Sequence, residues 1–200
     1  MVSRKNETFK KTHSFIKSFW EYLGQSQDKN FRMLHIVVGI AVIFQIIDSN
    51  FMHVKFGLNV WAYTHMFCGL SLSVLSVLLV IMALDKRGLR YYFPYLYNDY
   101  SAIKVDLSEL CKFRLPNSRS GSLAAIVQGL GLLALTLAWV SGFFWFTAWN
   151  WQSPYMHDLE EIHKTLVDPV EIYIYAHAFM GILHYVLQRY FPKFISNIKE

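Results

Sequence analysis

The sequence predicts an all-α integral membrane protein, a four-helix transmembrane bundle with an N-terminal interfacial amphipathic helix. Of its 200 residues, 54% are hydrophobic and 16% are charged, and the mean hydropathy is +0.26. A soluble domain carries about 25% charged residues, so this composition disfavours a soluble enzyme. An aromatic share of 17% excludes a disordered chain. A bilayer core about 30 Å thick requires about 20 mainly apolar residues per helix, and four stretches of the chain meet that requirement.

The N-terminal segment, residues 1–30, is predicted to be an amphipathic helix that lies on the cytoplasmic membrane surface. Apolar and aromatic residues recur there near helical spacing, with lysines elsewhere on the helical wheel: Phe9, His13, Ile16, Trp20 and Leu23 against Lys10, Lys11 and Lys17.

The membrane domain is expected over residues 31–194, with spans at about 33–50, 60–84, 122–149 and 169–191. The second and third spans contain no Asp, Glu, Lys or Arg. The loop 85–121 is expected to contain a short helix at 106–113, and residues 195–200 form a tail. Gln45 and Asp48, which are polar residues inside the first span, are expected to form internal hydrogen bonds.

Charge gives the expected orientation. Seven Lys and Arg residues precede the first span and seven lie in the loop 85–121, whereas the other two connecting loops contain one each. The positive-inside rule then places both termini and the loop 85–121 in the cytoplasm. The last outer loop is acidic, since Asp158, Glu160, Glu161 and Asp168 outweigh Lys164.

Histidines at membrane depth are the main functional signal, because ionisable residues there are costly. Five lie within or beside the spans: His35, His65, His163, His177 and His184. Any one of them is equally well explained by packing between helices. Together, in a four-helix bundle, they favour a cofactor held from facing helices.

Spacing limits the cofactor. His163 and His177 are 14 residues apart, which puts them on one helix face about 21 Å apart along the axis. His184 follows His177 after about 10 Å, too close for two stacked haems. The matching partners are His65 for His163 and His35 for His177. Counting residues from the ends of the spans places His184, rather than His177, at the membrane depth of His35. The space that two stacked haems require nevertheless selects His177. A zinc site would require ligands at one depth, and these histidines are spread along the membrane normal.

Four motifs carry a resemblance to a known family: Phe-Arg-Met-Leu-His ending at His35, Thr-His-Met-Phe-Cys-Gly from Thr64, Ile-His-Lys-Thr-Leu from Ile162, and Ala-His-Ala-Phe-Met-Gly-Ile-Leu-His from Ala176. Together they resemble the bacterial cytochrome b561 family of di-haem four-helix membrane proteins. The resemblance covers about 150 residues. It implies two non-covalent b-type haems, iron ligands at His35, His65, His163 and His177, and a non-ligating role for His184 near the inner haem. It also implies a multi-pass protein of the bacterial inner (plasma) membrane.

The sequence departs from the family pattern at Asp168-Pro169, where the family usually continues a helix. Asp168 can serve as an N-cap with Pro169 in the first turn of a new helix, which would detach His163 from His177. A kinked but continuous helix would keep the two histidines together.

The leading functional hypothesis is single-electron transfer between the quinone pool and a redox partner, because histidine at both axial positions leaves iron no open site. We expect the quinone on the inner side near Arg32, His184 and Gln188, with Arg32 also interpreted as an interfacial anchor. The alternatives are a superoxide oxidase that reduces quinone, a haem-bearing membrane anchor subunit of a larger oxidoreductase, and a haem-free membrane scaffold. The acidic outer loop disfavours superoxide, because an anion is steered by positive potential. No nucleic-acid partner is expected.

Overall fold

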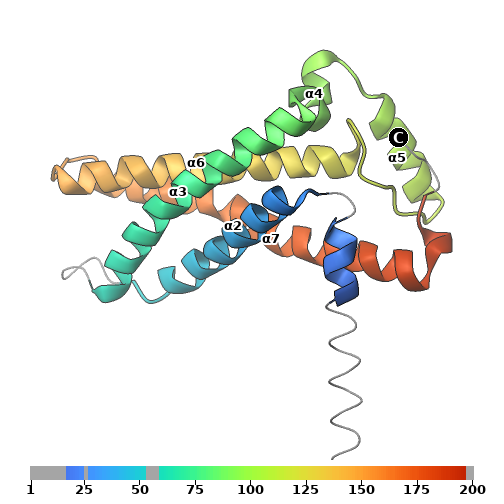
Figure 1. Cartoon of the computed structure of the whole chain (residues 1–200). Helices are drawn as coiled ribbons and strands as arrows, with labels where there is room; N and C mark the ends of the chain where they lie inside the picture. The colour runs from blue at the N-terminus through green and yellow to red at the C-terminus, as the bar shows by residue number, and fades with distance from the viewer. Residues whose placement is uncertain (1–16, 25–26, 53–58, 197–200) are drawn as a thin grey trace, which may run out of the picture.

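The computed structural model describes residues 17–24, 27–52 and 59–196, and four long helices dominate it (Figure 1). These helices are α2 (Lys29–Ser49), α3 (Val60–Arg87), α6 (Leu123–Asn150) and α7 (Met156–Tyr190). Each is long and apolar enough to cross a membrane. The fold is therefore the predicted all-α membrane bundle.

Three of these helices begin at a side-chain cap. The carboxylate of Asp28 accepts a hydrogen bond from the Phe31 N–H at 2.7 Å, and the Asn59 amide oxygen accepts one from the Ala62 N–H at 2.9 Å. Ser122 caps α6 in the same way through the Ala125 N–H. Such caps satisfy N–H groups that the first helical turn leaves unpaired. The helix α3 ends at Gly88, whose φ of +74° suits glycine.

The fourth long helix begins earlier than the predicted span at 169–191. It begins at Met156 and continues through Pro169, which lies inside the helix. Asp168 is consequently not an N-cap. Proline in a helix interior costs about 3 kcal/mol, and here the packing of α6 along α7 offsets that cost. His163 and His177 therefore lie on one continuous helix.

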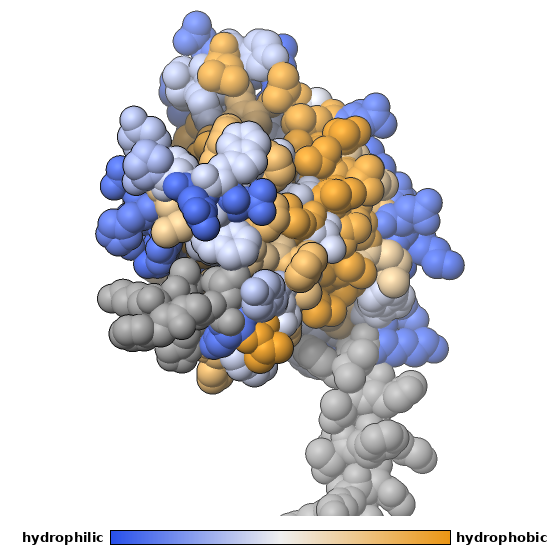
Figure 2. Space-filling model, turned by 90° about the vertical axis from the view of Figure 1, so that its left-hand side faces the viewer, coloured by the Kyte–Doolittle hydropathy of each residue, from blue (hydrophilic) through white to orange (hydrophobic). Residues whose placement is uncertain are grey.

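The long helices pack in a fixed order: α2 lies along α3, α6 lies along α7, and α3 contacts α6. A small buried core joins all four, consisting of Val38, Val42, Leu72, Leu79, Ala138 and Val170. Many large apolar side chains point outward instead, including Val60 at 71% and Phe67 at 69% exposure. Figure 2, which views the molecule from the end that carries the α6–α7 turn, shows hydrophobic side chains gathered on one flank. Lipid is the solvent that suits such a surface.

The two ends of the bundle differ. At one end short connections join α2 to α3 and α6 to α7 (Figure 1); we call it the turn end. At the other, residues 88–122 form α4 (Leu89–Tyr92), η1 (Pro94–Tyr97) and α5 (Ser101–Cys111), and η2 (Pro192–Phe194) follows α7; we call it the loop end. The short helix expected at 106–113 thus begins earlier, at Ser101, and ends at Cys111. Hydrogen bonds from the Ser101 hydroxyl, from Arg90 and from the Ser101 N–H, in that order of effect, hold the pKa of Asp99 below its usual value.

The loop end is fastened to the bundle by polar contacts. The buried carboxylate of Asp106 accepts a hydrogen bond from the Leu123 N–H at 2.8 Å and pairs with Arg119 at 2.6 Å. Leu115 also forms a short bridge with Ile195, beyond α7. The loop 85–121 is therefore a folded cap on the bundle.

Part of the expected N-terminal amphipathic helix lies within the described residues. Residues 17–24 are helical, and the rings of Phe19 and Tyr22 pack against Tyr185 of α7 at centroid distances of 5.2 and 5.3 Å. Trp20 and Leu23 belong to this helix, whereas Phe9, His13 and Ile16 lie outside the described residues.

Candidate functional site

Four of the histidines form two facing pairs in the bundle. At the turn end, His65 of α3 faces His163 of α7 with 6.4 Å between ring centroids and 76° between ring planes. Toward the loop end, His35 of α2 faces His177 of α7 at 5.7 Å and 72°. The structure thus brings the four candidate ligands together as two pairs, both with one member on α7.

The separation of the rings suits a metal ion between them. A metal–imidazole bond is about 2 Å long and each ring nitrogen lies about 1 Å from its centroid, so two rings on opposite sides of one metal have centroids about 6 Å apart. Both observed distances are close to that value. No group of three or more His, Cys, Asp or Glu residues suited to a metal occurs among the described residues.

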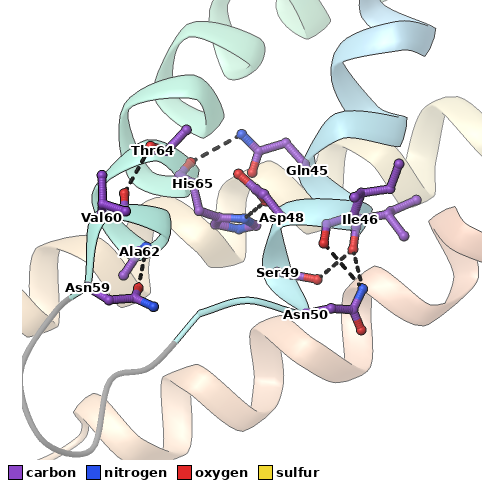
Figure 3. A network of polar contacts seen from close by, with 11 residues as sticks. Gln45, Ile46, Asp48, Ser49, Asn50, Asn59, Val60, Ala62, Thr64 and His65 are labelled. Carbon is purple, nitrogen blue, oxygen red and sulfur yellow. Dashed lines mark hydrogen bonds and ion pairs between the residues drawn. The ribbon is translucent and has the colours of Figure 1, made fainter.

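The His65 ring is oriented by the end of α2, as Figure 3 shows. Its Nδ1 lies 2.8 Å from Oδ1 of Asp48, whose side chain is 1% exposed. The Gln45 amide donates a further hydrogen bond to the His65 backbone carbonyl at 3.2 Å. Because the Nδ1–H of this ring donates a hydrogen bond to Asp48, the lone pair on Nε2 is available to bind a metal. The expected internal hydrogen bonds of Gln45 and Asp48 are confirmed.

The His163 ring is oriented by α6. The hydroxyl of Ser141 donates to the Ala138 carbonyl at 2.9 Å and lies 3.0 Å from His163 Nδ1. Because the hydroxyl has one proton, it accepts from Nδ1, which again leaves Nε2 free. A Cβ at Gly142 would come within 2.9 Å of the His163 ring, so glycine is required for this close approach.

The rings of the loop-end pair rest on aromatic side chains. The Tyr173 ring stacks on His177 with 5.1 Å between centroids, and its hydroxyl lies 3.3 Å from His177 Nδ1. The Phe31 ring stacks near His35 at 6.2 Å. Among the described residues, no side chain or carbonyl forms a hydrogen bond with the His35 ring. The loop-end pair therefore has only neutral neighbours at its ring nitrogens.

Open space adjoins the loop-end pair. Gly39 follows His35 by four residues and Gly181 follows His177 by four, so each glycine shares the helix face of its histidine. A Cβ at either position would meet no atom within 4 Å.

The remaining predicted site residues have other contacts. His184 Nε2 lies 3.1 Å from the Asn117 amide oxygen, so its ring binds the loop-end cap. Arg32 donates to the Trp20 carbonyl at 2.9 Å and lies over the Trp20 ring. Gln188 lines an open hollow of about 240 Å³ between residues 17–24 and α7. Arg32 and Gln188 thus both lie beside the N-terminal helix, and His184 does not join them.

Three partners of the histidines are not identifiable as such in the sequence. Ser141 and Tyr173 are residue types that occur throughout membrane helices, and nothing in their spacing marks them. Asn117 lies in a loop whose fold is not predictable from periodicity. Asp48 is recognisable in the sequence, since an acidic residue inside a span requires a partner. The sequence does not show which residue that partner is.

Comparison with known proteins gives one match. The family described as "Prokaryotic cytochrome b561" matches residues 26–196. This range includes all four long helices, both histidine pairs and the loop-end cap. No curated protein and no solved structure matches the chain.

Proposed function

The chain belongs to the prokaryotic cytochrome b561 family, and from this premise we propose that it binds two b-type haems, one between His65 and His163 and one between His35 and His177. The chain is a membrane b-type cytochrome that acts in electron transfer. The observation that supports the two-haem proposal is the pair of centroid distances, 6.4 and 5.7 Å, at two levels of one bundle.

Each side chain has a defined task in this proposal. The four histidines would hold the two haems, two histidines to each, and haems held in this way would supply single-electron transfer without an open site for a further ligand. Asp48 and Ser141 orient the turn-end rings, and Tyr173 orients His177. The apolar helices around the sites exclude water.

We place the turn end at the outer face and the loop end in the cytoplasm, since the basic residues concentrate at the loop end. A quinone then exchanges electrons near the loop-end haem. The hollow beside Gln188 supports this location, because Ser18, Tyr22 and Arg189 also line it and quinone oxygens accept hydrogen bonds.

A membrane anchor subunit of a larger oxidoreductase is the second candidate function. The folded cap at the loop end exposes apolar side chains outside the long helices, including Leu96 at 66% and Phe113 at 86%. Such residues suit contact with another subunit. Superoxide oxidation is less favoured, because Lys164 at the turn end is paired with Glu160 and Glu161 and offers an anion little attraction.

The test is a reduced-minus-oxidised absorption spectrum of the purified full-length protein, with a haem count per chain. We expect b-type bands, two haems per chain and reoxidation of the reduced protein by a quinone. Absence of a Soret band would overturn the proposal and favour a haem-free scaffold. Stable purification with further redox subunits would favour the anchor subunit.

A further inference from the structure

The turn-end pair has one feature that the loop-end pair lacks, a buried carboxylate on a histidine ring. Asp48 lies in the last turns of α2, and its side chain is almost fully enclosed at 1% exposure (Figure 3). Its Oδ1 is 2.8 Å from His65 Nδ1. The neutral Gln45, one turn earlier on α2, donates a hydrogen bond to the His65 backbone carbonyl. Asp48 therefore places a charge at the His65 ring, whereas Gln45 makes only a neutral contact with the main chain.

A carboxylate at this depth requires compensation. Burying a charge is costly unless it is paired, and within the described part of the chain the one ion-pair partner of Asp48 is His65. The second carboxylate oxygen, Oδ2, is buried and has no hydrogen-bond partner among those residues. A positive charge on the far side of the His65 ring would offset part of this cost.

The proposed haem supplies that charge in one redox state only. Ferric iron in a dianionic porphyrin with two neutral imidazoles has one net positive charge, and ferrous iron has none. A carboxylate on the ligand ring also raises the basicity of the ligand. Both effects stabilise the ferric state, and both therefore lower the reduction potential.

Within the described ranges, no carboxylate pairs with any of the other three rings. The partner of His163 is the Ser141 hydroxyl, and that of His177 is the Tyr173 phenol, which is longer at 3.3 Å. His35 has only the Phe31 and His177 rings beside it among the described residues. The sign of the asymmetry is thus clear: the negative charge is at the turn end.

We propose that Asp48 is a positioning residue that makes electron transfer from the turn-end haem to the loop-end haem favourable, by holding the turn-end haem at a lower potential than the loop-end haem. This inference rests on the two-haem function proposed above. One electron leaves the turn-end site and one arrives at the loop-end site, with no bond made or broken. The chain would then accept electrons from a donor at the turn end and deliver them at the loop end.

The test is a potentiometric titration of the full-length haem-loaded protein and of its Asp48→Asn variant. The amide keeps an oxygen that accepts the Nδ1 proton but removes the charge. We expect the equilibrium constant for reduction of the turn-end haem to rise at least tenfold, which raises its midpoint potential by about 59 mV for one electron. The midpoint potential of the loop-end haem should stay unchanged. The matched control is Ser49→Ala, at the residue next to Asp48, whose hydroxyl bonds the Ile46 carbonyl of its own helix; it should shift neither midpoint.

The haems are assigned with His177→Ala, which should keep only the turn-end haem, and His65→Ala, which should keep only the loop-end haem. If Asp48→Asn loses the turn-end haem, the two histidine variants test the inference instead. The haem left in His177→Ala must then have a lower midpoint potential than the haem left in His65→Ala. Two haems with unshifted midpoints in Asp48→Asn, or a higher midpoint at the turn end, would overturn this inference alone. A wild-type chain without haem would overturn the proposed function as well.

Discussion

The turn-end and loop-end histidine pairs share helix α7 and have similar ring separations, yet their surroundings differ. The turn-end rings donate hydrogen bonds to a carboxylate and to a hydroxyl, on Asp48 and Ser141. The loop-end rings are held by stacking on Phe31 and Tyr173, with open space beside two glycines. Two pairs with similar ligand geometry can thus be different sites, because the residues that contact the histidine rings set the orientation of the rings and the charge beside them.

The largest expected effect comes from removing one histidine of either pair. His65→Ala should leave one haem per chain by abolishing the turn-end site, and His177→Ala should leave one by abolishing the loop-end site, since each iron requires two rings. A pyridine haemochrome count on purified protein measures this. The matched control is His184→Ala, because His184 binds Asn117 and not a facing histidine. Retention of two haems in either ligand variant would refute that pair.

Filling the open space should affect the loop-end pair alone. Gly39→Leu would place a side chain on the helix face of His35, where a Cβ meets no atom within 4 Å, and should reduce the haem count from two toward one. Its control is Ile40→Leu, at a neighbouring side chain that is 64% exposed, which should keep both haems. An unchanged haem count in Gly39→Leu would show that the space does not serve the cofactor.

Smaller effects are expected from the neutral partners. Ser141→Ala removes the hydroxyl at His163, and Tyr173→Phe removes the hydroxyl at His177. A neutral hydrogen bond contributes about 1 kcal/mol, which a one-electron couple expresses as tens of millivolts. Ser141→Ala should therefore shift only the turn-end midpoint and Tyr173→Phe only the loop-end midpoint. A redox titration that finds both midpoints shifted in either variant would contradict separate sites.

The smallest effect should come from the contact between His184 and the cap. Asn117→Ala removes hydrogen bonds to the His184 ring and to the Ser196 carbonyl. A loss of about 1 kcal/mol corresponds to a melting temperature lower by about 2–4 °C for a chain of this size. Haem content should not change. Thermal unfolding followed at the Soret band checks both points, and a loss of haem from Asn117→Ala would assign His184 a role at the loop-end site.

Much of the fold is predictable from this sequence, because uncharged apolar runs of bilayer length leave few alternatives. The fourth helix begins earlier than the predicted span at 169–191 for a specific reason. Asp168-Pro169 has the local signature of a helix start, and only the packing of α7 against α6 shows that the helix begins at Met156.

The candidate site is predictable only in part. The 14-residue spacing of His163 and His177 identifies two levels on one face, because helical geometry is regular. The partners Ser141 and Tyr173 depend on how α6 and α7 are rotated about their axes, which periodicity does not determine. Asp48 is visible as a buried charge, but its pairing with His65 depends on the register of α2 against α3.

The most direct test of two unlike sites on one helix is a potentiometric titration of the full-length protein, followed at the haem α band. We predict two one-electron steps of equal amplitude, with the lower step lost in His65→Ala and the upper step lost in His177→Ala. A single step from one haem, or loss of the upper step in His65→Ala, would contradict the account.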